Sequence, residues 1–182
     1  MNIVQGSIGS MMESQGKNLA QAMLDIKAVV IIDVSGSMAN KDDGKEKTRF
    51  EIANDELATV QTNNPGHVAV IEFSDSARLI PYGALSQPDG TTNVAAALML
   101  AKSMDGFEDI KFILVSDGEP NNAEMAFQIG RQFHNPINTI YVGPKNNPSG
   151  AEFLKKLSAM TGGESSAQKL NLLSNVIAGY LN

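Results

Sequence analysis

Three predominantly apolar runs constrain the fold of this chain more than any other feature. Residues 28–32 read Ala-Val-Val-Ile-Ile, and two further runs, residues 68–73 and 111–115, each contain one charged residue, Glu72 and Lys111. No polar residue alternates within the first run, so both faces of that strand are expected to be buried. Strands of this kind lie inside a sheet that helices cover on both sides.

Segments with helical spacing separate these strands. They are predicted as helices at residues 18–26, 48–62, 93–104, 122–133 and 151–160, with a last helix marked by Leu170, Leu173, Ile177 and Tyr180. Further strands are predicted at residues 77–82, 137–142 and 164–167. The alternation predicts a three-layer α/β/α, doubly wound domain with a mostly parallel central sheet. Residues 28–32 and 112–115 should form adjacent strands at the centre of the sheet. Residues 77–82, which contain a proline near their end, should form one antiparallel edge strand.

The length of 182 residues fits one domain with a short extension. The content of 42% hydrophobic and 19% charged residues is that of a globular protein. Residues 1–16 are rich in Gly, Ser, Gln and Met without clear periodicity. We therefore divide the chain into a weakly ordered or helical N-terminal extension, residues 1–25, and a folded domain, residues 26–182. Residues 1–14 lack the charged and apolar regions of a secretory signal.

Charge and composition argue against several classes of function. The net charge of -6 and pI of about 4.9 disfavour a nucleic-acid partner, which needs a basic surface. Residues 41–49 mix both signs and are interpreted as a solvated loop. No apolar run reaches the ~20 residues of a membrane span. The absence of cysteine excludes disulfides and thiolate metal sites and fits a cytoplasmic protein. The sequence leaves the oligomeric state open.

Five oxygen-bearing residues follow the predicted strands or open a predicted helix. They are Asp33, Ser35, Ser37, Thr92 and Asp117. The carboxyl ends of parallel strands meet at one edge of a sheet, which is where open α/β sheets bind ligands. Three hydroxyls and two carboxylates are therefore expected at one place, and oxygen ligands alone select a hard divalent cation.

Each motif also has a purely structural interpretation. Ser35-Gly36-Ser37 can form a turn, Thr92 can cap a helix, and Asp117-Gly118 can form a tight turn. Asn121 and Asn122 are better explained as helix N-caps than as ligands. Residues 74–76, Ser-Asp-Ser, imitate the first motif without its context and are explained by a hairpin turn.

Taken together, the motifs resemble a known family. Asp33-Val34-Ser35-Gly36-Ser37, Gly90-Thr91-Thr92-Asn93 and Ser116-Asp117-Gly118 look like the three pieces of the metal-ion-dependent adhesion site of the von Willebrand factor A (vWA) family, in family order. The resemblance extends over residues 27–182. The family turn usually reads Gly-Gly-Thr, which places Thr92 in the threonine position.

The resemblance implies specific roles for the five residues. Ser35, Ser37 and Thr92 would bind Mg²⁺ or Mn²⁺ directly, while Asp33 and Asp117 would act through water or through hydrogen bonds to the serines. Because the site is expected at the sheet edge, replacing Asp33 or Asp117 by Ala is expected to remove metal binding with little loss of stability.

The function implied is that of a metal-dependent protein-binding module without enzymatic activity. The cation would capture an Asp or Glu side chain of a protein partner within a multiprotein assembly. One alternative is a metal-assisted phosphoryl-transfer or hydrolytic enzyme using the same crevice, and another is a structural module whose site is vestigial. Against catalysis, the chain has neither a nucleophile elbow nor a phosphate-binding glycine loop, and neither histidine adjoins the motifs.

Overall fold

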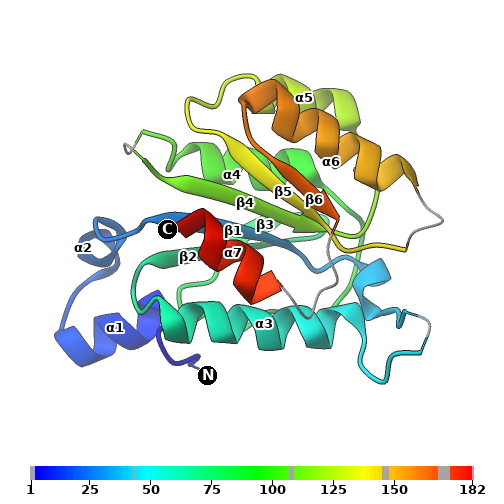
Figure 1. Ribbon diagram of the computed structural model, residues 1–182. Helices are drawn as coiled ribbons and strands as arrows, with labels where there is room; N and C mark the ends of the chain where they lie inside the picture. The colour runs from blue at the N-terminus through cyan, green and yellow to red at the C-terminus, as the bar shows by residue number, and fades with distance from the viewer. Residues whose placement is uncertain (1–2, 43, 107–108, 145–147, 168–172, 182) are drawn as a thin grey trace.

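The fold is a six-stranded sheet between two layers of helices, as Figure 1 shows for the computed structural model. The structure describes residues 3–42, 44–106, 109–144, 148–167 and 173–181. Its strands are β1 (Ala28–Asp33), β2 (Val68–Phe73), β3 (Ala77–Leu79), β4 (Lys111–Ser116), β5 (Ile137–Tyr141) and β6 (Ser165–Ala167). Its helices are α1 (Ile8–Gln15), α2 (Leu19–Met23), α3 (Arg49–Asn63), α4 (Val94–Lys102), α5 (Ala123–Gly130), α6 (Pro148–Thr161) and α7 (Leu173–Leu181), with a short 3₁₀ turn, η1 (Gly36–Ala39).

The sheet has the strand order β3-β2-β1-β4-β5-β6, and every neighbouring pair is parallel except β2 and β3. Strand β1 lies between β2 and β4, with Val30 opposite both Val70 and Ile113. The predicted three-layer, mostly parallel architecture is confirmed, including the central pair of strands and the antiparallel edge strand.

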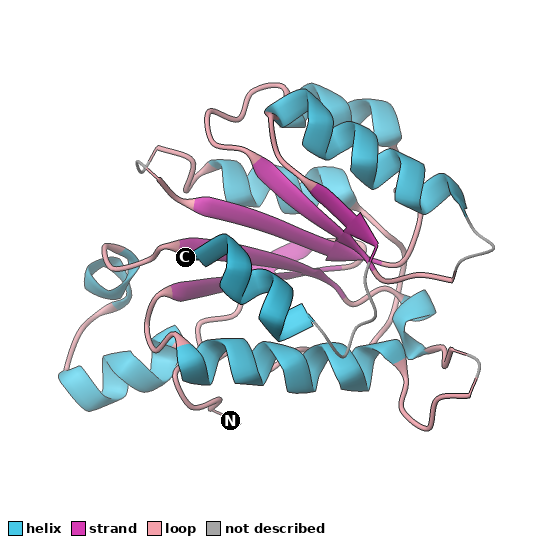
Figure 2. Ribbon diagram, viewed as in Figure 1, coloured by secondary structure: helices cyan, strands magenta, loops and turns pink. Residues whose placement is uncertain are grey.

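The two faces of β1 enter two different cores because side chains alternate along a strand. Val29 and Ile31 pack with residues of α4, α5 and α6, whereas Val30 and Ile32 pack with residues of α3 and α7. Figure 2 shows these two groups of helices on opposite sides of the sheet. Burial on both faces accounts for the absence of polar residues from residues 28–32 of this strand.

Helix α3 begins at a capping box, which fixes where the charged loop before it ends. The Thr48 side chain accepts a hydrogen bond from the Glu51 N–H, and the Glu51 carboxylate accepts one from the Thr48 N–H at 2.7 Å. The predicted helix at residues 48–62 is confirmed within one residue at each end.

Other boundaries differ slightly from their predictions. Strand β3 ends at Leu79 because the Pro81 and Tyr82 carbonyls instead accept hydrogen bonds from the N–H groups of Gly9 and Val4. Helices α4 and α5 end at residues 102 and 130, two and three residues before the predicted ends. Leu170 of the predicted last helix lies outside the described residues.

The N-terminal segment contains the two short helices α1 and α2, joined by turns and irregular backbone. Weak order was predicted for residues 1–16, but residues 8–15 form α1, which begins at the Ser7 N-cap. Ile8 is 1% exposed, and a Cβ on Gly9 would lie 2.4 Å from the Tyr82 ring. The extension therefore packs closely on the domain, and the division at residue 25 stays a prediction.

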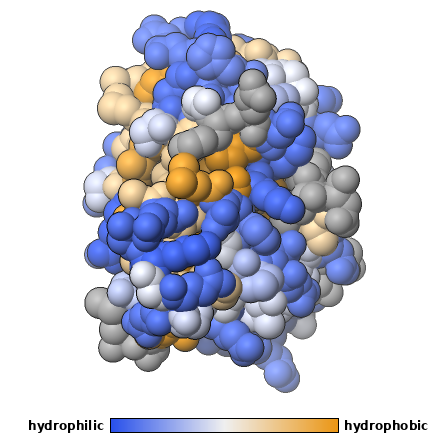
Figure 3. Space-filling model, turned by 90° about the vertical axis from the view of Figure 1, so that its left-hand side faces the viewer, coloured by the Kyte–Doolittle hydropathy of each residue, from blue (hydrophilic) through white to orange (hydrophobic). Residues whose placement is uncertain are grey.

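Figure 3 shows the end of the molecule near the amino ends of the strands, where a small apolar group is surrounded by hydrophilic residues. Among the described residues, no helix is long and apolar enough to cross a membrane.

Candidate metal centre

A crevice forms at the carboxyl ends of β1 and β4, where the order of strands reverses. From β1 the chain continues to β2 on one side, whereas β4 lies on the other side of β1. Asp33 is the last residue of β1, and Asp117 directly follows β4. This is the place at which open α/β sheets bind ligands.

Asp33 is a fully buried carboxylate that ties the two strand ends together. Its Oδ1 accepts a hydrogen bond from the Ser35 N–H at 2.8 Å, and its Oδ2 accepts one from the Ser116 hydroxyl at 2.6 Å. Burial raises the pKa of the Asp33 carboxyl to about 6, although these hydrogen bonds act in the opposite direction. The nearby negative charge of Asp117 contributes to the raised pKa.

Ser35 and Ser37 lie on the turn that follows β1. Ser35 is the N-cap of η1, and its hydroxyl lies 3.1 Å from that of Ser37. The Ser37 hydroxyl donates to Asp117 Oδ1 at 2.7 Å. The two serines therefore form a continuous polar chain from the end of β1 to the residue after β4.

Thr92 joins this group from the loop before α4. A Cβ built on Gly118 would lie 3.6 Å from the Thr92 hydroxyl and 3.9 Å from the Ser37 hydroxyl, so both hydroxyls flank the same point. Thr91 has different contacts, because its hydroxyl donates to Asp75 Oδ1 at 2.6 Å. The structure thus brings Thr92 to the crevice while Thr91 fastens the loop.

Asn121 has a role that the sequence did not reveal. Its Oδ1 accepts a hydrogen bond from the Thr92 N–H at 3.0 Å, and its own N–H donates to the Thr92 carbonyl at 2.9 Å. Its side-chain amide also donates to the Thr91 hydroxyl at 2.7 Å. The predicted cap holds for Asn122 alone, whose Oδ1 accepts from the Met125 N–H. Asn121 instead positions Thr92.

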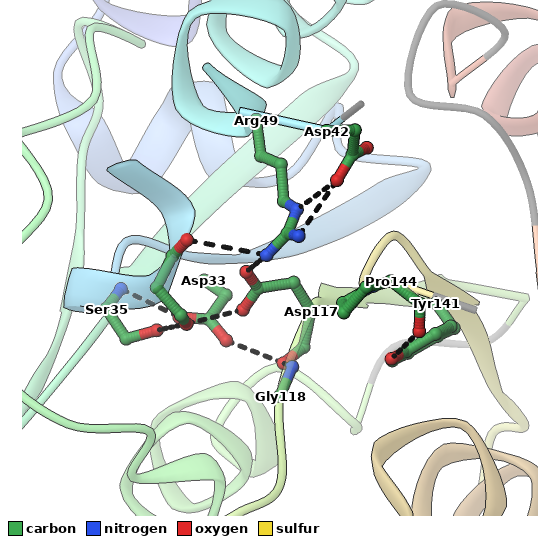
Figure 4. A network of polar contacts seen from close by, with 10 residues as sticks. Asp33, Ser35, Asp42, Arg49, Asp117, Gly118, Tyr141 and Pro144 are labelled. Carbon is green, nitrogen blue, oxygen red and sulfur yellow. Dashed lines mark hydrogen bonds and ion pairs between the residues drawn. The ribbon is translucent and has the colours of Figure 1, made fainter. Parts of the chain in front are cut away.

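Arg49 is the second residue that the sequence interpretation missed. Its Nη1 donates to Asp117 Oδ2 at 2.6 Å, and its Nε donates to Asp42 Oδ1 at 2.9 Å, as Figure 4 shows. The interpretation of residues 41–49 as a solvated loop is wrong for Arg49, which is 6% exposed. Burial opposes its charged form, but the bonds to Asp117 and Asp42 prevail and raise the pKa of the guanidinium.

One signal could have identified Arg49. It is the first residue of α3, and a cation at a helix N-terminus is disfavoured by the helix dipole. Arg49 at that position therefore requires nearby anions, which are Asp117 and Asp42. The same contacts argue against the expectation that Asp117 can be lost at little cost, since its removal leaves a buried guanidinium with Asp42 and a long, 3.5 Å bond to the Ser37 carbonyl.

The donor set suits a hard divalent cation. The five predicted residues come together and offer only oxygen atoms, from three hydroxyls and two carboxylates. Among the described residues, no group of three or more His, Cys, Asp or Glu side chains could hold a metal ion. The candidate centre is thus distinguished by its hydroxyls. When bound, Mg²⁺ or Mn²⁺ would supply a positive charge that attracts an anionic oxygen.

Comparison with solved structures agrees with this architecture. The chain is similar to manganese-loaded TRAP protein from Plasmodium vivax, with a TM-score of 0.57 and 15% identity over 87% of this chain and 74% of that one. It is also similar to proximal thread matrix protein 1 from the mussel byssus, with a TM-score of 0.57 and 16% identity. The match covers 85% of this chain and 44% of the mussel protein. At these identities the likeness shows the fold alone.

The sequence itself carries a family signature. A search of curated proteins finds no match. The sequence profile of the von Willebrand factor type A domain, however, matches residues 28–119, which is half of the chain and includes all three polar motifs. The chain therefore belongs to the von Willebrand factor type A domain family.

Proposed function

We propose that this vWA domain is a cytoplasmic, metal-dependent protein-binding module. It uses Mg²⁺ or Mn²⁺ held by Asp33, Ser35, Ser37, Thr92 and Asp117 to capture an Asp or Glu side chain of a protein partner, within a multiprotein assembly. The observation that carries the proposal is the convergence of these side chains from three separate segments on one crevice.

The arrangement of charge favours an outside anion. The three hydroxyls are neutral, and part of the negative charge of Asp117 is already balanced by Arg49. A divalent cation held there keeps unbalanced positive charge, which a partner carboxylate can satisfy. The domain is acidic overall, so attraction at short range by the cation must outweigh weak long-range repulsion screened over ~8 Å.

The position of the histidines supports binding without catalysis. His67 and His134 precede β2 and β5, at the amino ends of the strands. His67 contacts the Asp25 carbonyl, and His134 contacts Asp105. Neither can serve as a general base in a crevice at the opposite edge of the sheet.

Calorimetric titration with MgCl₂ and MnCl₂ tests the metal centre. Wild-type protein freed of metal should bind one divalent ion, and Ser37→Ala should lose that binding. Asp55→Ala is the control, since Asp55 pairs with Lys47 on the exposed side of α3. A partner should then be retained by immobilised wild-type domain in Mg²⁺ and released by chelator, and Ser37→Ala should not retain it. Retention that is independent of both Mg²⁺ and Ser37 would refute the proposal.

A further inference from the structure

The Arg49 guanidinium is inserted between two carboxylates at the edge of the candidate metal centre. Asp117 uses both of its oxygens, with Oδ1 accepting from Ser37 and Oδ2 accepting from Arg49. Asp42 accepts from two other nitrogens of the guanidinium, Nε at 2.9 Å and Nη2 at 2.8 Å. The guanidinium is therefore shared between one residue of the centre and one residue of the loop before α3.

The Asp117 and Arg49 side chains are buried, whereas that of Asp42 is partly exposed to solvent. The Asp117 and Arg49 side chains are 0% and 7% exposed, whereas that of Asp42 is 40% exposed. The pair inside the crevice is thus poorly screened by water, so its charges act strongly on a cation nearby. Asp42 provides an anchor toward which the guanidinium can be drawn.

We propose that Arg49 is a competing cation that sets the metal affinity of this centre. This inference rests on the proposed function, and it specifies how that centre is regulated. Without metal, Arg49 neutralises Asp117 and holds it in place. With metal, Arg49 and the metal ion both interact with the negative charge of Asp117, so Arg49 weakens metal binding. Asp42 reduces this competition because it also binds the guanidinium.

A purely structural role for Arg49 makes a different prediction. If Arg49 only fastens the loop before α3 to the residue after β4, its removal should disorder the centre and weaken metal binding. Competition requires the opposite sign: removal should strengthen metal binding while the metal-free fold becomes less stable. The direction of the change in metal affinity therefore separates the two roles.

Calorimetry with MgCl₂ on metal-free protein provides the test. Arg49→Met should tighten the Kd at least about tenfold, because two like charges a few ångströms apart in a poorly screened site repel strongly. Arg49→Lys, which keeps the charge but loses the forked donors that reach both Asp117 and Asp42, should not tighten the Kd. Arg78→Met is the matched control. Arg78 pairs with buried Glu72 at the β2–β3 edge, so its loss should leave the Kd unchanged.

Asp42→Asn tests the sharing of the guanidinium and does not depend on the folding of the Arg49 variants. With Asp42 neutral, the charge of Arg49 interacts with Asp117 alone of the two residues, and the affinity for Mg²⁺ should fall severalfold. Glu119→Gln removes one negative charge from an exposed residue close to Asp117 and serves as the control for charge alone. In the Arg49→Met background, Asp42→Asn should no longer weaken binding beyond the Glu119→Gln effect.

The outcomes separate this inference from the proposed function. If wild type binds Mg²⁺ and Arg49→Met binds it equally or more weakly, the competition is refuted while the metal-dependent function stands. If wild type binds no Mg²⁺ but Arg49→Met does, the competition is supported and the proposed function fails. If Asp42→Asn weakens binding no more than Glu119→Gln, the sharing of Arg49 is refuted.

Discussion

The Ser37 hydroxyl donates a hydrogen bond to Asp117 Oδ1 at 2.7 Å, joining residues eighty positions apart in the sequence. This contact connects the turn after β1 to the end of β4. It also directs the Ser37 hydroxyl hydrogen toward Asp117, so one Ser37 lone pair accepts from the Ser35 hydroxyl and the other can bind a cation. The metal-free crevice is in this sense already organised for a cation.

The two adjacent threonines should differ in their effect on metal binding. Thr92→Val, which keeps the shape of the side chain but removes its hydroxyl, should weaken Mg²⁺ binding at least tenfold. Thr91→Val should have a much smaller effect, because the Thr91 hydroxyl is bonded to Asp75 and Asn121. Calorimetry measures both affinities. A larger loss for Thr91→Val would show that the threonine position has been assigned to the wrong residue.

The stability of the metal-free domain should depend on pH through Asp33. Its folded pKa of about 6 lies above the ordinary value of 3.8, so its stabilising contribution is fully present below pH 3.8 and is lost as the pH rises through 6. Asp33→Asn does not titrate and avoids this loss. Between pH 4 and 7, the free energy of unfolding of the variant should therefore gain roughly 2 kcal/mol relative to wild type.

Urea denaturation in chelator at pH 4, 5.5 and 7 checks this dependence on pH. Asp55→Asn, on the exposed side of α3, is the control and should show no such trend relative to wild type. A difference between Asp33→Asn and wild type that stays constant across the three pH values would contradict the assignment.

Removing Asp117 should destabilise the metal-free domain. Asp117→Ala leaves the buried Arg49 guanidinium with the half-exposed Asp42 and the Ser37 carbonyl, and costs about 3 kcal/mol. Chemical denaturation in chelator measures the change. Combining Arg49→Met with Asp117→Ala removes both charges and should recover part of the lost stability. If the double variant loses more stability than the two single variants lose in sum, Arg49 and Asp117 are not a coupled pair.

Gly90 should be intolerant of alanine for two separable reasons. Its φ of +73° is strained for residues with a Cβ, and a Cβ there would lie 2.6 Å from the Asp75 carboxylate. Gly44 has the same φ, but a Cβ there would have no atom of the described residues within 4 Å apart from its chain neighbours, so Gly44→Ala isolates the cost of backbone strain. Thermal denaturation should show Gly90→Ala to be less stable by roughly 1–3 kcal/mol, and more affected than Gly44→Ala.

The fold could be predicted largely from the sequence because burial leaves a simple pattern. A strand covered on both faces favours a nearly continuous apolar run, as at residues 28–32, and helices between parallel strands have a regular spacing of apolar residues. The boundaries were less predictable because they depend on distant partners. Strand β3 ends where residues 81 and 82 accept hydrogen bonds from the N-terminal segment, which is far away in the sequence.

The candidate site was only partly predictable. Its hydroxyls and carboxylates lie at strand ends or, for Thr92, just before a helix, places that local patterns can identify, and the structure brings all five together. Arg49 and Asn121 were missed because their roles depend on contacts with Asp117 and Thr92, which lie 68 and 29 positions away. A charged residue in a charged loop resembles a solvated one until its partners are known, and a second asparagine before a helix resembles a cap.

The bonds between Asn121 and Thr92 have a mechanical consequence. The backbone and the side chain of Asn121 both form hydrogen bonds with the Thr92 backbone. The Gly90 carbonyl accepts a hydrogen bond from the Gly36 N–H at 3.1 Å. Tension applied to the Thr92 loop by a tethered partner would therefore pass into the segment that starts α5 and into the turn after β1. These two segments would share the pull, so the loop would detach only after its contacts to both had broken.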